Sequence, residues 1–321
     1  IIEGKQGMIK LRRIIMRALV TGGAGFIGSY LIPRLLEKGM EVVVFDITKE
    51  PAALEPIKDE ILYVRGDLAS EADLYRVMMS HKITNVFHLG AILAGPCEEN
   101  PIYGYKINFH ATQTLLDASV ALKVNRFFML SSISVFGKDV SEPVADDARK
   151  NPGTVYGQTK LACEHLLQWY YRKHALDTRA LRFTWVFGPG RTRGITALYS
   201  SLILDAIARN EPMTITNPNE KGDWLYIQDA IRAILAVWDA KDPKQRIYNI
   251  AGGVHAIGDV VEIAKRLKPD AKVSLVPQGE AQSPYPVSYD DHVARSEICW
   301  KPKYSIETAV REHMEIVLGQ Q

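Results

Sequence analysis

The sequence predicts an α/β fold in which helices cover both faces of a doubly wound parallel sheet, with a smaller C-terminal lobe beside it. Short apolar runs alternate with amphipathic segments through the first half of the chain, as in strand–helix–strand units. Each run is apolar along nearly its whole length, which is typical of strands that are buried on both faces. Crossovers between such strands are right-handed, so the repeated alternation indicates one continuous parallel sheet.

Five apolar runs are the predicted strands of this sheet. They cover residues 17–20, 42–45, 61–64, 86–89 and 127–130. Helical periodicity lies between them, for example at residues 72–79 and 112–118. Pro33 falls inside the helix after the first strand, where it removes one backbone hydrogen bond.

The same signals divide the 321 residues into three parts. Residues 1–13 are expected to be a tag or extension, because the chain does not begin with Met and shows no signal-peptide pattern there. Residues 14–183 are expected to form the sheet domain. After residue 183, Gly and Pro clusters interrupt shorter elements, so residues 184–321 should form mainly a substrate-binding lobe. A strand near residues 246–253 is apolar enough to return to the main sheet.

Composition and charge exclude several classes of function. The formal net charge is +2 without a basic patch, which gives no support for nucleic-acid binding. No apolar run reaches the roughly 18 residues that a membrane span needs. Cys97, Cys163 and Cys299 show neither metal-ligand nor disulfide spacing. We therefore expect a cytoplasmic protein with no metal site.

The stretch TGGAGFIG, residues 21–28, joins the first strand to the first helix. Gly22, Gly25 and Gly28 let the backbone turn tightly and approach a charged ligand without a Cβ in the way. The helix directs its free N–H groups and the positive end of its dipole at the same place. This pattern favours the pyrophosphate of a dinucleotide, although glycine turns at such junctions also occur for packing alone.

An acidic residue ends the second strand and indicates which dinucleotide binds. Asp46 comes 18 residues after Gly28, where a carboxylate can accept hydrogen bonds from both ribose hydroxyls and repel a 2′-phosphate. The next residues, Ile47 and Thr48, supply no arginine for such a phosphate, so NAD is preferred to NADP. An acid that merely ends a strand is the alternative interpretation.

Later strand ends should meet the cofactor at the same edge of the sheet. Asp67 can accept a hydrogen bond from the adenine amino group, and Leu68 can cover its ring. His88 is interpreted as a structural residue rather than a catalyst. The other residues expected to contact the cofactor are Phe26, Ile27, Leu89, Gly90, Ala91 and Phe183.

The candidate catalytic residues follow this cofactor pattern. Tyr156 and Lys160 lie four residues apart, on one face of a predicted helix. A free tyrosine has a pKa of about 10, and a nearby ammonium and a cationic nicotinamide ring would lower it toward a useful base. A surface pair is the usual meaning of this spacing alone, but here it follows a dinucleotide pattern. Ser132, at the end of the fifth strand, can hydrogen-bond the reacting oxygen, with Ser131 and Ser134 supporting turns.

The glycine signature, the serine strand and the YxxxK pattern together resemble the extended short-chain dehydrogenase/reductase family, which includes NAD-dependent epimerases and dehydratases. The likeness runs over nearly the whole chain from Arg17. It implies a Rossmann fold, bound NAD, catalytic roles for Ser132, Tyr156 and Lys160, and a homodimer with a four-helix contact. It also implies that Asn108 lies on a helix lining the cofactor site; a buried amide that bonds a neighbouring backbone is the alternative.

Two branches of that family resemble different parts of the chain. Nucleotide-sugar epimerases usually carry an asparagine before a Y/F-G-P turn and arginines on the substrate diphosphate. Here Trp185 and Gly222 stand at an asparagine and an arginine position, and the adjacent Lys221 does not reproduce a bidentate clamp. Residues 88–101 and 285–302 instead resemble the short-chain type of L-threonine 3-dehydrogenase.

The substrate loop departs from that second branch, whose loop ends in T-T-D-Y, because this chain has GITALY at residues 194–199. Arg191 or Arg193 in the preceding loop can hold a substrate carboxylate, and a solvated basic loop is the alternative. Thr196 is a candidate hydrogen-bond donor to the substrate.

The sequence therefore predicts an NAD-dependent dehydrogenase that oxidises a secondary alcohol of a small polar metabolite. Tyr156 would take the hydroxyl proton, Ser132 would orient the oxygen, and Lys160 would hold the nicotinamide ribose. A sugar or nucleotide-sugar 4-epimerase that returns the hydride to the opposite face is the first alternative. A protein that binds NAD without catalysis is the second.

Overall fold

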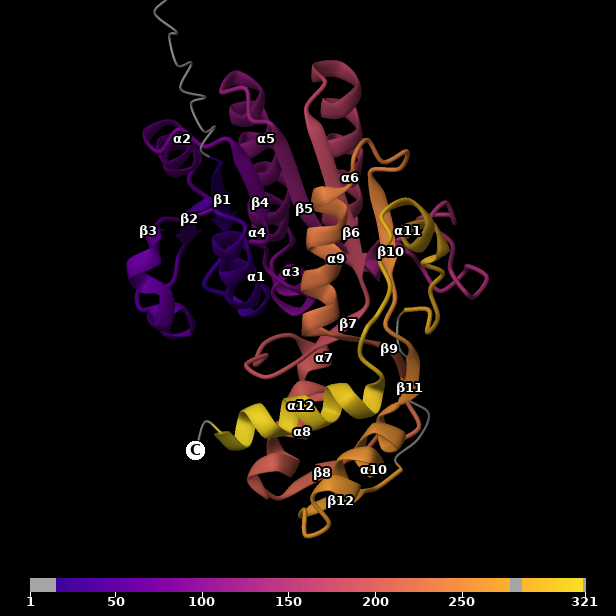
Figure 1. The fold of residues 1–321 in the computed structure, drawn as a ribbon. Helices are drawn as coiled ribbons and strands as arrows, with labels where there is room; N and C mark the ends of the chain where they lie inside the picture. Colours follow the sequence, from indigo (N-terminus) through magenta and orange to yellow (C-terminus); the bar gives the residue numbers. More distant parts are fainter. Residues whose placement is uncertain (1–15, 278–284, 320–321) are drawn as a thin grey trace, which may run out of the picture.

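The computed structural model describes residues 16–277 and 285–319, and a parallel sheet forms the centre of this part (Figure 1). Seven described strands pair side by side in the order β10-β6-β5-β4-β1-β2-β3. Every pairing between these neighbours is parallel. The strand order reverses between β1 and β4, which is where open α/β sheets bind ligands. The predicted doubly wound α/β fold is confirmed.

Six of the seven strands overlap the predicted segments, and β6 is the strand that was not predicted. They are β1 (Arg17–Thr21), β2 (Glu41–Asp46), β3 (Ile61–Arg65), β4 (Asn85–His88), β5 (Arg126–Ser132), β6 (Asp177–Phe183) and β10 (Ile247–Ile250). The last of these falls in the segment expected to return to the sheet, and it pairs with β6.

Helices cover both faces of this sheet. The long ones are α1 (Phe26–Glu37), α2 (Glu71–Ser80), α5 (Ala111–Ala121), α6 (Val155–His174) and α9 (Ile227–Asp239). Shorter helical segments are η1 (Ala52–Glu60), α3 (Ala94–Glu99), α4 (Pro101–Tyr105), η2 (Lys106–His110) and η3 (Ile133–Val135).

Residues on the strands alternate between two apolar layers, as the pleat of a strand requires. Ala18 and Val20 of β1 belong to a cluster with α1 and α9, whereas Leu19 belongs to a cluster with α2, α5 and α6. Phe128 and Phe127 of β5 divide between the same two layers. Because both faces are buried, the strands read as continuous apolar runs in the sequence.

A smaller lobe lies below the sheet in Figure 1. Its strands are β7 (Trp185–Phe187), β9 (Lys221–Tyr226) and β11 (Val254–Ala256), and β8 (Met213–Ile215) with β12 (Val273–Leu275). Its helices are α7 (Ile195–Leu198), α8 (Ser201–Arg209), α10 (Ile257–Leu267) and α12 (Ile306–Gly319), while α11 (His292–Glu297) lies beside β10. The cluster on the α9 face continues into this lobe, so the two parts share one core.

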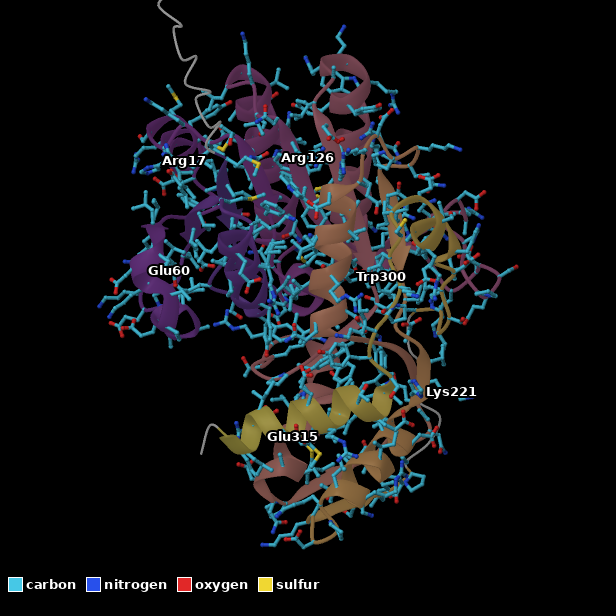
Figure 2. All side chains as sticks on the ribbon, viewed as in Figure 1. Arg17, Glu60, Arg126, Lys221, Trp300 and Glu315 are labelled. Atoms are coloured by element: carbon cyan, nitrogen blue, oxygen red, sulfur yellow. The ribbon has the colours of Figure 1, made fainter. Side chains whose placement is uncertain are left out.

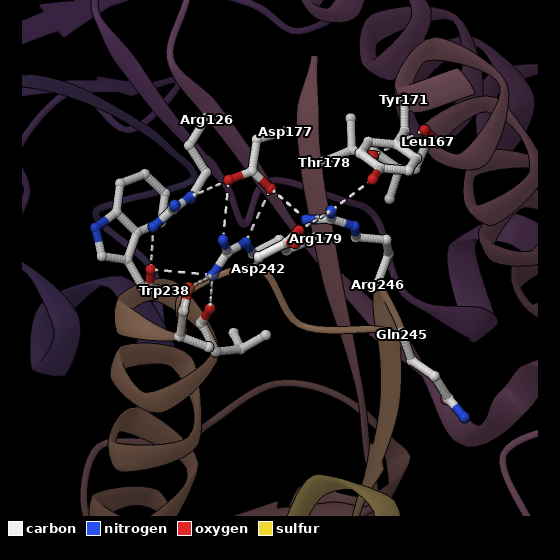
Figure 3. Close-up of polar contacts among 12 residues, drawn as sticks. Arg126, Leu167, Tyr171, Asp177, Thr178, Arg179, Trp238, Asp242, Gln245 and Arg246 are labelled. Atoms are coloured by element: carbon white, nitrogen blue, oxygen red, sulfur yellow. Dashed lines mark hydrogen bonds and ion pairs between the residues drawn. The ribbon is translucent and has the colours of Figure 1, made fainter. Parts of the chain in front are cut away.

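The end of α9 is fixed to the sheet by arginines that converge on Asp177 (Figure 3). Arg179 is 1% exposed and donates hydrogen bonds to the carbonyls of Val237, Trp238 and Ala240. Asp177 accepts hydrogen bonds from Arg126, Arg179 and Arg246 at 2.6, 2.9 and 2.9 Å. A cation at a helix C-terminus complements the helix dipole, so this network sets the position of α9 and of the lobe strand before it.

Candidate active site

The glycine loop between β1 and α1 is packed too closely for a larger residue. Gly22 has a φ of +67°, and a Cβ on it would lie 2.6 Å from Gly90 Cα. A Cβ on Gly28 would lie 2.4 Å from the carbonyl oxygen of Gly23. In the described structure no side chain caps α1, so the N–H groups of its first turn remain available to an anion.

The predicted cofactor residues from several strand ends meet around this loop. Asp46 Oδ2 accepts a hydrogen bond from the N–H of Ala24 at 3.0 Å, which places the carboxylate beside the loop. The other oxygen accepts from the N–H and hydroxyl of Thr48 at 3.0 and 2.8 Å. A Cβ on Gly90 would lie 2.7 Å from Leu68 Cδ1, so Leu68 borders the same site.

The remaining predicted cofactor residues differ in how accessible they are. Phe26 and Ile27 on α1 are partly buried, and so are Leu89 and Ala91 after β4. Asp67 Oδ1 accepts a hydrogen bond from the N–H of Ala69 at 2.8 Å. Gly25 is exposed. In contrast, Phe183 is 4% exposed and packs in the main core at the end of β6.

His88 is a structural residue held between two hydroxyl groups. Its Nδ1 lies 2.6 Å from Thr21 Oγ1, and its Nε2 lies 3.0 Å from Thr112 Oγ1. Burial lowers the pKa of His88 to about 3, so the ring is neutral at physiological pH. A neutral ring with both nitrogens occupied braces β1 and β4 against α5.

Tight packing at the start of α6 brings Tyr156 to the serine turn. A Cβ on Gly157 would lie 2.1 Å from the carbonyl oxygen of Ser134, so the helix rests directly on that turn. Thr154 caps the helix by accepting a hydrogen bond from the N–H of Gly157 at 3.0 Å. Ser132 Oγ donates to Ser134 Oγ at 2.9 Å and accepts from the N–H of Ser134 at 3.1 Å. Ser132 also acts on the phenol, because it opposes the rise in the pKa of Tyr156.

Lys160 reaches the same place from one turn further along α6. Its Nζ donates to the carbonyl of Leu130 at 2.8 Å and lies 5.7 Å from the centroid of the Tyr156 ring. Burial lowers the pKa of the Lys160 ammonium. The ammonium therefore sits over the face of the ring, and part of its hydrogen-bonding capacity is used by the strand.

The electrostatic balance at the phenol includes a second cation. Burial raises the pKa of Tyr156, and the Ser132 side chain and the charge of Arg191 oppose that rise. Arg191 donates to the carbonyl of Val186 and to Thr196 Oγ1, the latter at 2.6 Å. Arg193 is exposed, so the structure separates two arginines that the sequence leaves as alternatives.

Asn108 braces the loop after β4 rather than standing free in the site. Its side-chain oxygen accepts from the N–H of Ile92 at 2.9 Å, and its amide donates to the Ile92 carbonyl at 3.0 Å and to Thr159 Oγ1 at 3.2 Å. It lies on the π-helical segment η2 and is 2% exposed. These contacts agree with the alternative interpretation, a buried amide that bonds a neighbouring backbone.

Buried ionic groups behind the serine turn were not predicted. Ser131 donates to Glu164 at 2.6 Å instead of supporting a turn, and Glu164 forms an ion pair with Arg182 at 2.8 Å. Arg182 also donates to the carbonyl of Asp146 and to the side chain of Asn249. The network ties α6 to β5, β6 and β10, and its members are too far apart in sequence to be linked by spacing.

The residues at the two branch-defining positions are packed against each other. A Cβ on Gly222 would lie 2.3 Å from the Trp185 ring. Lys221 is exposed and lies at the outer edge of the smaller lobe (Figure 2). Neither position therefore supplies a bidentate cation to the site.

Two further observations concern the described residues only. None of their helices is both long and apolar enough to cross a bilayer. Their His, Cys, Asp and Glu side chains form no cluster suited to a metal ion, and their cysteines are free.

Comparison with known proteins agrees with this geometry. A model of the NAD dependent epimerase/dehydratase family matches residues 18–251. An uncharacterized epimerase/dehydratase of Staphylococcus aureus is 26% identical over 317 residues, covering 94% of this chain and 96% of that protein. The structure is similar to UDP-glucose 4-epimerase of Thermotoga maritima with UDP-glucose, with a TM-score of 0.86 and 25% identity over 95% of this chain and 99% of the other. It is also similar to a GalE-like L-threonine dehydrogenase of Cupriavidus necator, with a TM-score of 0.83, 25% identity and the same coverage of both chains.

Proposed function

We propose a function from one premise: the chain belongs to the NAD-dependent epimerase/dehydratase family and is an enzyme of that family. Within the family, we infer that it oxidises a secondary alcohol of a small polar metabolite and releases NADH. The packing of Trp185 over Gly222 carries this choice, because it closes the position at which nucleotide-sugar epimerases usually hold an arginine. A site without that clamp is better suited to a small substrate than to a nucleotide diphosphate.

The residues around the glycine loop fit the adenosine and pyrophosphate parts of NAD. Gly22 and Gly28 are packed against backbone, which keeps the loop in its tight turn, and within the described residues the first turn of α1 is left without a side-chain cap where a pyrophosphate would bind. Asp46 is held beside that loop with a carboxylate that can accept from the adenosine ribose. When bound, NAD+ supplies the hydride acceptor.

The side chains of the site divide the remaining work. Tyr156 accepts the hydroxyl proton of the substrate, which requires its phenolate form. Ser132, which opposes the rise in the pKa of that phenol, would orient the reacting oxygen. Lys160, whose ammonium lies over the ring and donates to the Leu130 carbonyl, would hold the ribose hydroxyls.

A 4-epimerase of a sugar or nucleotide sugar is the second candidate, favoured by the likeness to the Thermotoga maritima UDP-glucose 4-epimerase. It would use the same side chains without net NADH formation. A panel of threonine, hydroxy acids, uronic acids and UDP-sugars, assayed for NADH absorbance, separates the two. We expect NADH to accumulate with a small alcohol; epimerisation of a UDP-sugar without NADH would overturn the proposal.

The Tyr156→Phe variant tests the alternative that the protein binds NAD but catalyses no reaction. It should bind NAD+ as the wild type does but lose turnover, because only the ionisable hydroxyl is removed.

A Trp169→Glu variant tests the oligomeric state of the protein. Trp169 on α6 is 46% exposed, and we propose that α6 contributes to a homodimer contact in a cytoplasmic enzyme. Sedimentation should then show a dimer for the wild type and a monomer for that variant.

A further inference from the structure

We propose that Arg191 binds a carboxylate that the substrate carries close to its reacting carbinol, so that the substrate is a small hydroxy acid. The inference rests on the proposed dehydrogenase function and names its substrate class. It concerns Arg191 as a residue that contacts substrate, with Thr196 as the positioning residue that holds the guanidinium.

The guanidinium of Arg191 is turned inward without an acidic partner. It donates to the Val186 carbonyl and the Thr196 hydroxyl, which are both neutral. Within residues 16–277 and 285–319, no Asp or Glu side chain forms an ion pair with it. The inward arginines Arg126, Arg179 and Arg182 differ, because each pairs with a carboxylate.

A buried cation without an acidic partner among the described residues is costly, and an anionic ligand would relieve that cost. Burial lowers the pKa of Arg191 to about 10, and the nearby Tyr156 phenol opposes that change. The guanidinium therefore stays charged at neutral pH. A substrate carboxylate would supply the missing charge and two hydrogen-bond acceptors in the geometry that arginine prefers.

The position of Arg191 indicates where on the substrate the carboxylate lies. The guanidinium interacts electrostatically with the Tyr156 phenol, which takes the carbinol proton. A Cβ on Gly194 would lie 3.7 Å from Arg191 Nη2 and 3.0 Å from Leu93 Cδ1, so the guanidinium packs close to this loop. With Arg191 on the anion and Tyr156 on the carbinol, the inference puts both groups on one small molecule. In a nucleotide sugar, the diphosphate would lie away from the sugar carbon that reacts.

The test uses keto acids as probes, since they occupy the product site beside NAD+ without turnover. Acetoacetate and pyruvate are titrated by calorimetry into the NAD+-saturated enzyme, each against its neutral match, acetoacetamide or pyruvamide. We expect at least one acid to bind at least tenfold more tightly than its amide. The Arg191→Met variant should lose about 100-fold in affinity for that acid and little for the amide.

Matched variants separate a contact with substrate from a general role. Arg193→Met, an exposed arginine of the same loop, should bind the acid as the wild type does. Thr196→Val should weaken the binding of the acid, because it removes the hydroxyl that accepts from the guanidinium. Thr196→Ser keeps that hydroxyl and should bind the acid as the wild type does. An arginine that acted only on the Tyr156 phenol would not discriminate the acid from the amide.

Equal affinity for acid and amide, or unchanged acid affinity in Arg191→Met, would overturn the inference while NAD+ still binds. Absence of acid binding by the NAD+-bound wild type would do the same and leave the proposed dehydrogenase function standing. Failure of the wild type to bind NAD+ would instead remove the proposed function, and the inference with it.

Discussion

The indole ring of Trp185 covers Gly222 so closely that a Cβ on the glycine would lie 2.3 Å from the ring. Trp185 is on β7 and Gly222 on β9, and these parallel strands pair with Trp185 opposite Trp224, two residues after Gly222. Trp185 is 7% exposed, so its ring is part of the core. The two departures from the nucleotide-sugar pattern are therefore one structural feature: a large residue on one strand requires a glycine on the other.

The Gly222→Arg variant should be destabilised, because its side chain would enter space that the Trp185 ring fills. Overpacking of this kind costs about 1–3 kcal/mol of unfolding free energy. Trp185→Asn alone should cost about 3–5 kcal/mol through the cavity it leaves. The double variant should lose at least about 1 kcal/mol less than the sum of the two. Urea unfolding measures all three, and simple additivity would show that the two positions do not share space.

The Ser132→Ala variant should shift the pH dependence of turnover. The oxidation rate should rise with pH as the Tyr156 phenol ionises, since burial raises the pKa of that phenol. Ser132 opposes this rise in pKa. Its removal should therefore move the rising limb of the pH–rate profile to higher pH and lower kcat by about 100-fold. A kcat profile over pH checks the shift, with Tyr156→Phe as the variant that should show no limb. An unshifted limb in Ser132→Ala would remove Ser132 from the mechanism.

The strands and the catalytic residues could be predicted from the sequence because local rules determine them. Val42 to Phe45 read as one apolar run because sheet faces on both sides are buried, and Gly22 stands where φ is positive. Tyr156 and Lys160 lie on one helical face at fixed spacing, so their proximity follows from the helix alone.

Other features depend on contacts between distant segments. Arg191 and Arg193 cannot be told apart by sequence, because only the fold brings Val186 and Thr196 to one of them. Ser131 reads as a turn residue until Glu164 is seen beside it, 33 residues away. Such tertiary contacts carry no period and no local signal.

The Asp146→Asn variant should change how stability depends on pH. Burial raises the pKa of Asp146 to about 6, and its Oδ2 has no hydrogen-bond partner in the described structure. Between about pH 4 and pH 6 the folded state therefore binds more protons at this group than the unfolded state does. Linkage then requires this contribution to fall as pH rises through that window.

The variant carries no ionisable group at that position, so the penalty disappears. Its unfolding free energy relative to wild type should increase by about 2 kcal/mol between pH 4 and pH 7. Urea unfolding at several pH values measures this difference, which cancels the titration of other groups. A difference that stays constant with pH would mean that Asp146 titrates normally in the folded protein.

The Asp46→Ser variant should relax the choice between NAD and NADP. The carboxylate is fixed beside the glycine loop by Ala24 and Thr48, where it would accept from the ribose hydroxyls and repel a 2′-phosphate. Serine removes the charge, so NAD+ affinity should fall about tenfold while NADP+ affinity rises. Calorimetric titration with both cofactors gives the ratio of the two affinities.

The Thr48→Val variant is the matched control, because it removes one hydrogen bond to the Asp46 carboxylate but keeps the charge. It should lower the affinity for NAD+ slightly and still exclude NADP+. If Asp46→Ser left the ratio of the two affinities unchanged, the carboxylate would not face the ribose, and the cofactor would have to lie differently across the sheet edge.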